Sequence, residues 1–194
     1  MFDFIGRLHP LLVHLPIGIL LLAILFEWFP SRKKFRYLKR SVHTILLAGS
    51  FTAFFSCLTG YLLSQSGDYE SDRVGWHQWM GIILTVYSFG YTWMRSAKEF
   101  KSYYKSFSIV LLILLMVTGH LGGSLTHGDD YLTAGLTSSS SLDIPKVNLQ
   151  EAMYYDDLVK PILEDKCYGC HGSSKQKGKL RLDEPQHILK GGKD

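Results

Sequence analysis

Four stretches of the chain are continuously apolar, and polar segments separate them. Each stretch is about 20 residues long, which is the length an α-helix needs to cross a lipid bilayer. None contains Lys or Arg, and tryptophans stand near several of their ends, as in the interfacial belts of membrane proteins. The pattern predicts four membrane-spanning helices at residues 10–29, 43–63, 76–94 and 107–125.

The polar connections differ in charge, and this difference predicts the orientation of the helices. Cytoplasmic loops of membrane proteins are enriched in Lys and Arg. The first and third connections are basic, and the second is mainly acidic: Arg32, Lys33, Lys34, Arg36, Lys39 and Arg40 in the first; Arg95, Lys98, Lys101 and Lys105 with Glu99 in the third; Asp68, Glu70 and Asp72 with Arg73 in the second. We therefore expect an antiparallel bundle in a bacterial inner membrane, with both termini periplasmic.

The last third of the chain is polar, so the mean hydropathy of +0.06 averages two unlike parts. Residues 133–150, with serines at 138–141 and Pro145, are expected to be a linker. Apolar residues then recur at helical spacing over 151–166, where Pro161 should kink the helix or begin a new one. The expected organisation is all-α: a transmembrane domain at 1–132, the linker, and a small helical domain at 151–194. The net charge of +4 follows from the basic loops, and no nucleic-acid partner is expected.

Cysteine and histidine form one specific motif, Cys167-Tyr168-Gly169-Cys170-His171. In a Cys-x-x-Cys-His sequence the two thiols attach haem c covalently and the adjacent histidine binds the iron. A structural zinc site would need four ligands, and here only His187 follows the motif. A redox disulfide would require a thioredoxin-like βαβ context, which the pattern lacks. Haem c is therefore the favoured interpretation, and it agrees with a periplasmic location for this part of the chain.

The second axial ligand of that haem is not evident from the sequence. No Met follows the motif, Met153 precedes it, and His187 is a candidate. The chain stops at 191–194 without a terminal helix. We expect the domain to be the first part of a longer one, with the sixth ligand beyond residue 194.

Histidines at membrane depth are candidates for function, because ionisable residues are costly there. The helical rise places His14, His77 and His120, from three helices, near the periplasmic end of the bundle. Bundles hold cofactors between facing side chains, so two of these three histidines could bind a haem b, or all three a metal ion. A histidine could also accept a proton from quinol. Each could instead be an interfacial side chain, which is the favoured interpretation for His9, His43 and His127 and for Glu27; Cys57 is expected to be packed among apolar residues.

Two family resemblances support this division of the chain. Residues 7–18 (RLHPLLVHLPIG), His77-Gln78-Trp79-Met80-Gly81 and residues 118–123 (TGHLGG) resemble motifs of the DUF2231 predicted membrane proteins. Residues 159–172, followed by Lys179-Leu180-Arg181-Leu182-Asp183, resemble the planctomycete-type cytochrome c domain. The first resemblance implies a four-helix membrane module, and the second implies a periplasmic haem c domain.

The sequence therefore favours a membrane cytochrome that carries electrons from a membrane donor, with quinol as candidate, through haem b to haem c and on to a periplasmic acceptor. One alternative keeps haem c and makes the bundle a haem-free anchor or a metal site, in a redox sensor or a subunit of a respiratory complex. No catalytic constellation is visible, so the chain is expected to be an electron-transfer protein or an oxidoreductase subunit.

Overall fold

The computed structural model describes residues 2–29, 36–65, 71–128, 131–133, 153–173 and 175–193. All regular elements in these ranges are helices, and the only β pairing is an isolated bridge between His171 and Gln176. The chain divides into two compact units, residues 1–66 with 75–120 and residues 67–74 with 121–194. The predicted linker falls almost entirely outside the described residues. The all-α fold class is confirmed.

The first apolar stretch forms an interrupted helix. It consists of α1 (Phe2–Arg7), α2 (His9–Leu12) and α3 (His14–Trp28). Proline has no N–H to donate, so Pro10 and Pro16 each leave a carbonyl of the preceding turn without its helical partner. The helix is interrupted at Leu8, before Pro10, and at Val13, before Pro16, although both residues keep helical backbone angles. The distortion predicted near Pro16 is therefore present.

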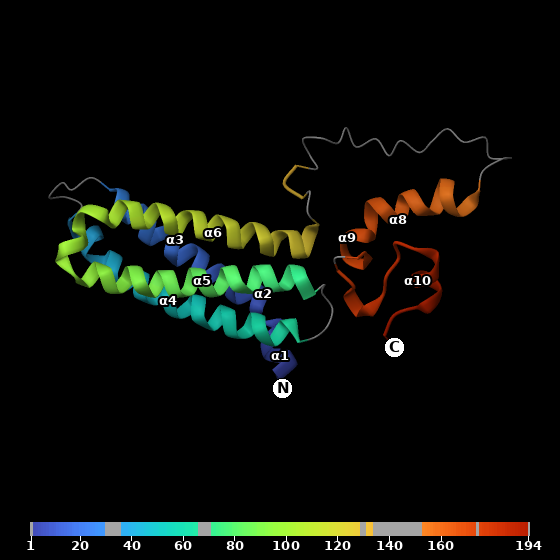
Figure 1. The fold of residues 1–194 in the computed structure, drawn as a ribbon, viewed down its shortest axis with the longest axis horizontal. Helices are drawn as coiled ribbons and strands as arrows, with labels where there is room; N and C mark the ends of the chain where they lie inside the picture. Colours follow the sequence, from blue (N-terminus) through green and yellow to red (C-terminus); the bar gives the residue numbers. More distant parts are fainter. Residues whose placement is uncertain are drawn as a thin grey trace. The chain divides into compact units, whose positions relative to one another are not determined.

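Three further long helices, which belong mostly to the first unit, lie side by side with α3 (Figure 1). They are α4 (Arg36–Ser64), α5 (Ser71–Ser96) and α6 (Tyr104–His127), and a 3-10 segment, η2 (Lys98–Tyr103), precedes α6. A common apolar core contains Leu20 of α3, Leu46 of α4, Leu84 of α5 and Leu111 of α6. Each predicted apolar stretch falls within this set of helices.

The polar contacts at the two ends of the bundle establish that neighbouring helices are antiparallel. At one end, the last turn of α3 meets the beginnings of α4 and α6 and the end of α5, through Trp28 with Ser108 and Arg95 with Lys39. At the other end, His9 of α2 contacts Ser56 near the end of α4, and His77 at the beginning of α5 contacts Thr118 near the end of α6. The helices therefore run alternately up and down, as predicted.

Three described helical stretches are long and apolar enough to cross a membrane: Phe4–Trp28, Tyr37–Ser64 and Phe100–His127. Helix α5 has 26 residues but is not among them. Three of its polar residues, Thr85, Ser88 and Thr92, are buried and donate to carbonyls of their own helix. Its exposed side includes Ile83 and Val86. These three buried hydroxyl groups therefore lower the mean hydropathy of α5 although they lie inside the bundle.

The second unit contains short helices around the cysteine motif. They are a π-helical turn η3 (Tyr154–Val159), α8 (Lys160–Lys166), α9 (Tyr168–His171), a 3-10 turn η4 (Lys177–Lys179) and α10 (Pro185–Lys190). Pro161 stands in the first turn of α8, where its missing N–H costs nothing. The helix predicted before the motif is therefore present from Tyr154, and Pro161 begins a new segment of it.

Candidate functional site

The two cysteines and the histidine of the motif are held together by one short helix. The N–H groups of Cys170 and His171 donate to the carbonyl of Cys167 at 3.0 and 2.9 Å, which closes the turn of α9. Cys167 is half-buried, Cys170 is exposed, and both are free thiols. A single helical turn therefore presents the three groups that haem c attachment requires.

The imidazole of His171 has a defined tautomer. Its Nδ1 lies 3.3 Å from the carbonyl oxygen of Leu180. A carbonyl oxygen can only accept a hydrogen bond, so Nδ1 must carry the proton and Nε2 must carry the lone pair when the ring is neutral. Ligating histidines commonly have their other ring nitrogen oriented in this way. The donor set of Cys167, Cys170 and His171 thus fits a covalently attached haem, which would supply one-electron redox chemistry when bound.

A bidentate ion pair follows the motif. The guanidinium of Arg181 donates to both carboxylate oxygens of Asp183 at 2.9 and 2.6 Å. These bonds hold the pKa of the Asp183 carboxyl below its ordinary value. The pair therefore stabilises the folded domain above the pKa that Asp183 has in the unfolded chain, and this contribution is lost as the pH falls through the lowered folded-state pKa.

We expect Asp183→Asn to destabilise the haem domain at neutral pH by roughly 1 kcal/mol, because well-formed surface ion pairs contribute about that much. The difference from the unchanged protein should shrink on acidification and disappear once the pH is below the lowered folded-state pKa of Asp183. Acid titration of the full chain, followed by the haem c absorption band, measures it. Arg181→Lys is the matched control, since it keeps the charge and loses the fork; a difference between Asp183→Asn and the unchanged protein that persists at low pH would contradict this account.

The candidate distal ligands lie in different surroundings. Met153 is exposed, and it immediately precedes η3. His187 is partly buried, with Nδ1 3.6 Å from Asp183 Oδ1 and 3.5 Å from Glu184 Oε2. His187 is therefore held beside two carboxylates, and a distal role for it or for Met153 stays a prediction.

The structure separates the three histidines predicted for the membrane site by their burial. His14 and His120 are exposed, whereas His77 is half-buried with Nδ1 3.2 Å from the carbonyl oxygen of Thr118. Over the described ranges, no group of three or more His, Cys, Asp or Glu residues is placed to hold a metal ion. His77 also lies in contact with a second histidine.

His9, which the sequence suggested was merely interfacial, lies beside His77. Their ring centres are 6.3 Å apart and the ring planes are inclined by 73°. His9 donates from Nδ1 to the carbonyl of Ser56 at 2.9 Å, and Thr59 Oγ1 lies 3.4 Å from the same nitrogen. Its place in the pair depends on the interrupted N-terminal helix, whose rotation the sequence pattern does not give. The remaining histidines of the bundle, His43 and His127, contact the hydroxyls of Ser96 and Thr126.

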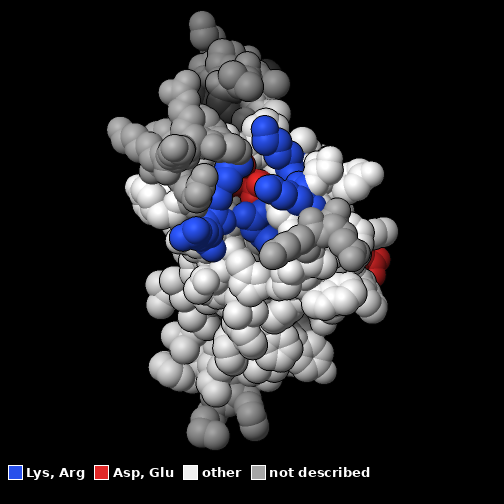
Figure 2. Space-filling view, turned by 90° about the vertical axis from the view of Figure 1, so that its left-hand side faces the viewer, with Lys and Arg blue, Asp and Glu red and all other residues white. Residues whose placement is uncertain are grey.

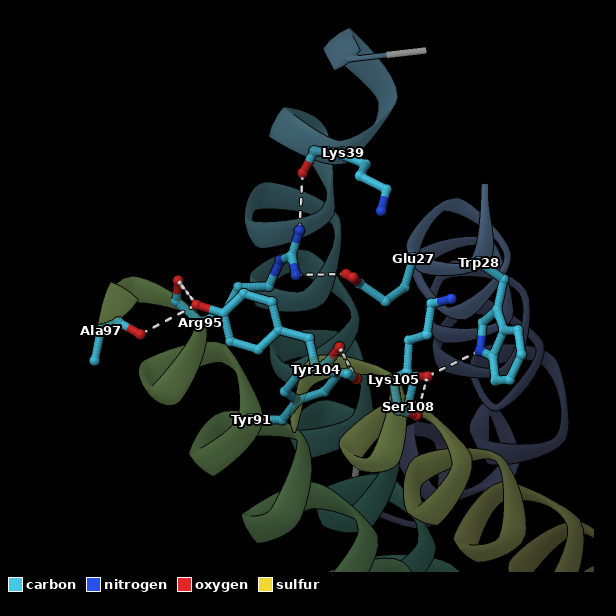
Figure 3. A network of polar contacts seen from close by, with 9 residues as sticks. All are labelled: Glu27, Trp28, Lys39, Tyr91, Arg95, Ala97, Tyr104, Lys105 and Ser108. Carbon is cyan, nitrogen blue, oxygen red and sulfur yellow. Dashed lines mark hydrogen bonds and ion pairs between the residues drawn. The ribbon is translucent and has the colours of Figure 1, made fainter. Parts of the chain in front are cut away.

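A buried ion pair lies at the opposite end of the bundle, and the sequence pattern does not predict it. Glu27, expected to be interfacial, is only 5% exposed and forms an ion pair with Arg95. Arg95 also donates to the carbonyl of Lys39 at 2.9 Å and stacks over the ring of Tyr104 at 4.6 Å (Figure 3). The pair therefore joins α3, α4, α5 and α6.

The surroundings of this ion pair are basic and well bonded. Tyr104 donates to the carbonyls of Arg95 and Ala97, Tyr91 donates to the carbonyl of Tyr104, and Trp28 donates to Ser108. Lys and Arg side chains gather around an acidic side chain on this face (Figure 2). A lone acid at the end of one apolar stretch and an arginine just after another were the only sequence signals for the contact.

Two family models match the chain, and they divide it near the end of the bundle. The predicted membrane protein model DUF2231 matches residues 7–134, which is more than half of the chain. The chain belongs to the DUF2231 family. A second model, planctomycete cytochrome C, matches residues 167–194, which begin at Cys167 of the motif. No curated protein and no solved structure matches the chain. This DUF2231 protein is therefore a membrane-associated cytochrome, and both resemblances stated from the sequence are confirmed.

Proposed function

We propose that this protein is an inner-membrane cytochrome that accepts electrons from a membrane donor at its bundle and delivers them through haem c to a periplasmic acceptor. The observation that carries the proposal is the Cys167–His171 turn, where one helical segment presents two thiols and an oriented imidazole. The chain that carries this turn has three helical stretches suited to a bilayer. Donor, acceptor and any partner subunits of a respiratory complex belong to the proposal.

The proposed orientation places the cysteine motif in the periplasm. It treats α5 as the fourth span, because its buried hydroxyls bond to its own backbone and its outer side carries Ile83 and Val86. The described basic residues Lys39, Arg40, Lys101 and Lys105 belong to the connections at the Glu27 end of the bundle, which is the expected cytoplasmic end. His9 and His77 are then near the periplasmic face.

In this proposal the bundle contributes a haem b near the periplasmic face, held by histidines. Imidazole ligands fix the position of such a haem and set its potential, and the surrounding apolar side chains exclude water. Quinol is the candidate donor. It releases two electrons and two protons on oxidation, so it would have to pass its electrons singly and release its protons to the periplasmic side.

The test is the haem content of the detergent-purified full chain. Haem staining on a denaturing gel detects the covalent group, and a pyridine haemochrome spectrum separates b-type from c-type haem. We expect a haem signal that stays with the polypeptide and about one b-type haem for each c-type haem. Absence of a covalent haem would overturn the cytochrome assignment. A c-type haem alone would overturn the bundle haem.

A c-type haem without a b-type haem would indicate a different function for the bundle. The separate positions of the exposed His14 and His120 and the half-buried His77 favour a bundle that only anchors the haem domain. The protein would then be a membrane-tethered carrier, a redox sensor or a subunit that receives electrons from a neighbouring protein. Metal analysis of the same sample distinguishes a plain anchor from a bundle that binds another metal ion.

A further inference from the structure

We infer that His9 and His77 are the two axial ligands of the membrane haem, an assignment that rests on the bundle haem proposed above. They are the described histidine rings that lie in contact within the bundle, with ring centres 6.3 Å apart. They come from helices that are far apart in the sequence, α2 and α5, so the folded bundle creates the pair.

Both rings are held in the tautomer that a metal ligand needs. His9 Nδ1 faces the carbonyl of Ser56, and His77 Nδ1 faces the carbonyl of Thr118. Because carbonyl oxygens only accept hydrogen bonds, each Nδ1 carries the proton and each neutral ring keeps its lone pair on Nε2. His171 of the haem c motif has the same arrangement with the carbonyl of Leu180. The three histidines assigned to haem iron therefore share one tautomer and one kind of backbone partner.

The spacing of the rings and the number of ligands favour haem iron. Two imidazoles that bind one metal ion from opposite sides have ring centres about 6.4 Å apart, since each metal–nitrogen bond is about 2.0 Å long and each nitrogen lies about 1.2 Å from its ring centre. The observed separation of 6.3 Å agrees with this value. A zinc site would take further protein ligands, and the described residues supply no group of three. A haem iron needs only two axial ligands, because the macrocycle supplies the other four nitrogens.

Two buried hydroxyls beside these rings support a bound group. Ser56 Oγ and Thr118 Oγ1 are buried without a hydrogen-bond partner among the described residues, and they belong to the residues whose carbonyls hold the two rings. The Ser56 residue is only 6% exposed. Leaving a buried hydroxyl unpaired costs about 1–3 kcal/mol, so native proteins usually satisfy it with protein, water or ligand atoms. Unused hydrogen-bonding capacity in the residue that holds each ring is expected where a bound molecule supplies the missing partner.

The other sequence-predicted ligands differ in burial. His14 and His120 are exposed, whereas His9 and His77 are half-buried. His9 is instead held closely by the bundle: a methyl group at Gly60 would lie 2.8 Å from its Cε1 atom. Any side chain at position 60 would therefore displace this ring, which gives a way to disturb the pair without removing a ligand.

The test compares the ratio of b-type to c-type haem in full-length variants, with the covalent haem as the internal standard for synthesis and export. We expect His9→Gln and His77→Gln each to lower the ratio at least about tenfold, because a bis-imidazole site does not retain haem on one ligand. His43→Gln, at the far end of the bundle, is the matched control. Loss of haem b from His14→Gln or His120→Gln, with retention in His9→Gln and His77→Gln, would overturn the inference and leave the proposed function standing. Absence of haem b from the unchanged protein would overturn both.

Two further variants separate ligation from general misfolding. His77→Met keeps a haem ligand, so haem should remain while its reduction potential rises and near-infrared magnetic circular dichroism changes from bis-histidine to histidine–methionine coordination. Gly60→Ala should alter the low-spin haem signal through displacement of His9. Gly90→Ala is its control, because a methyl group there meets nothing within 4 Å. An unchanged haem spectrum in both His77→Met and Gly60→Ala would contradict axial ligation by this pair.

Discussion

Replacing Cys167 and Cys170 together by alanine is expected to abolish the covalent haem. Both thioether bonds require a cysteine sulfur, and the α9 turn offers these two thiols only. The gel haem stain should fall to background, while the bundle remains in the membrane because it shares no core residue with the motif. Each single variant should keep one attachment and a reduced stain.

The matched control is Cys57→Ala, which removes the third cysteine of the chain. Cys57 lies in α4 with its sulfur 3.3 Å from Thr85 Oγ1, so its loss should leave the haem stain unchanged. A full-intensity stain in the double variant would exclude haem c at this motif. Zinc that copurifies with the unchanged protein and disappears from the double variant would favour the structural metal site instead.

Replacing Glu27 by alanine is expected to destabilise the bundle by about 3–5 kcal/mol, because it leaves the charge of Arg95 buried without its partner. The side chains of this pair are only 6% and 9% exposed. Arg95 would keep its bond to the carbonyl of Lys39 and its stacking on Tyr104, which do not neutralise its charge. Thermal unfolding of the full chain in detergent, followed by tryptophan fluorescence, should show a clear fall in Tm.

The double variant Glu27→Met with Arg95→Met provides the sharper comparison. Replacing both members of a buried pair by apolar residues removes the uncompensated charge, so the double variant should be more stable than Glu27→Ala or Arg95→Met alone. Glu164→Ala, in the exposed part of α8, is the control for loss of a carboxylate elsewhere. Losses that simply add in the double variant would mean that Glu27 and Arg95 do not act as a pair.

The membrane helices and the haem motif could be predicted because their signals are local. The length of an apolar helix can be read directly from its run of apolar residues, and Cys167, Cys170 and His171 lie close together in the sequence. The partners of Glu27 and of His77 could not be predicted, since each lies on a different helix and contact depends on how the helices rotate about their axes. The sequence indicated which end of the bundle His77 occupies, and the fold then brought His9 to it.

The charge pattern of the sequence does not predict the role of one residue, Arg95. Arg95 follows the third apolar stretch, and a basic residue in such a position normally indicates only that the connection is cytoplasmic. In the structure it lies in the last turn of α5 and turns inward to Glu27. A long flexible side chain at a helix end can either extend into a basic loop or turn inward to a buried acid. Only the packing of α3 against α5 decides which of the two occurs.

The inward-facing hydroxyls of α5 have a consequence for the two ends of the chain. Counting only the three most apolar stretches gives an odd number of crossings, which would leave the N-terminus and Cys167 in opposite compartments. With α5 inserted the number is even, and both lie on the same side. In the proposed topology, the burial of Thr85, Ser88 and Thr92 lets a moderately polar helix present an apolar surface to lipid, and the cysteine pair would then lie outside the reducing cytoplasm.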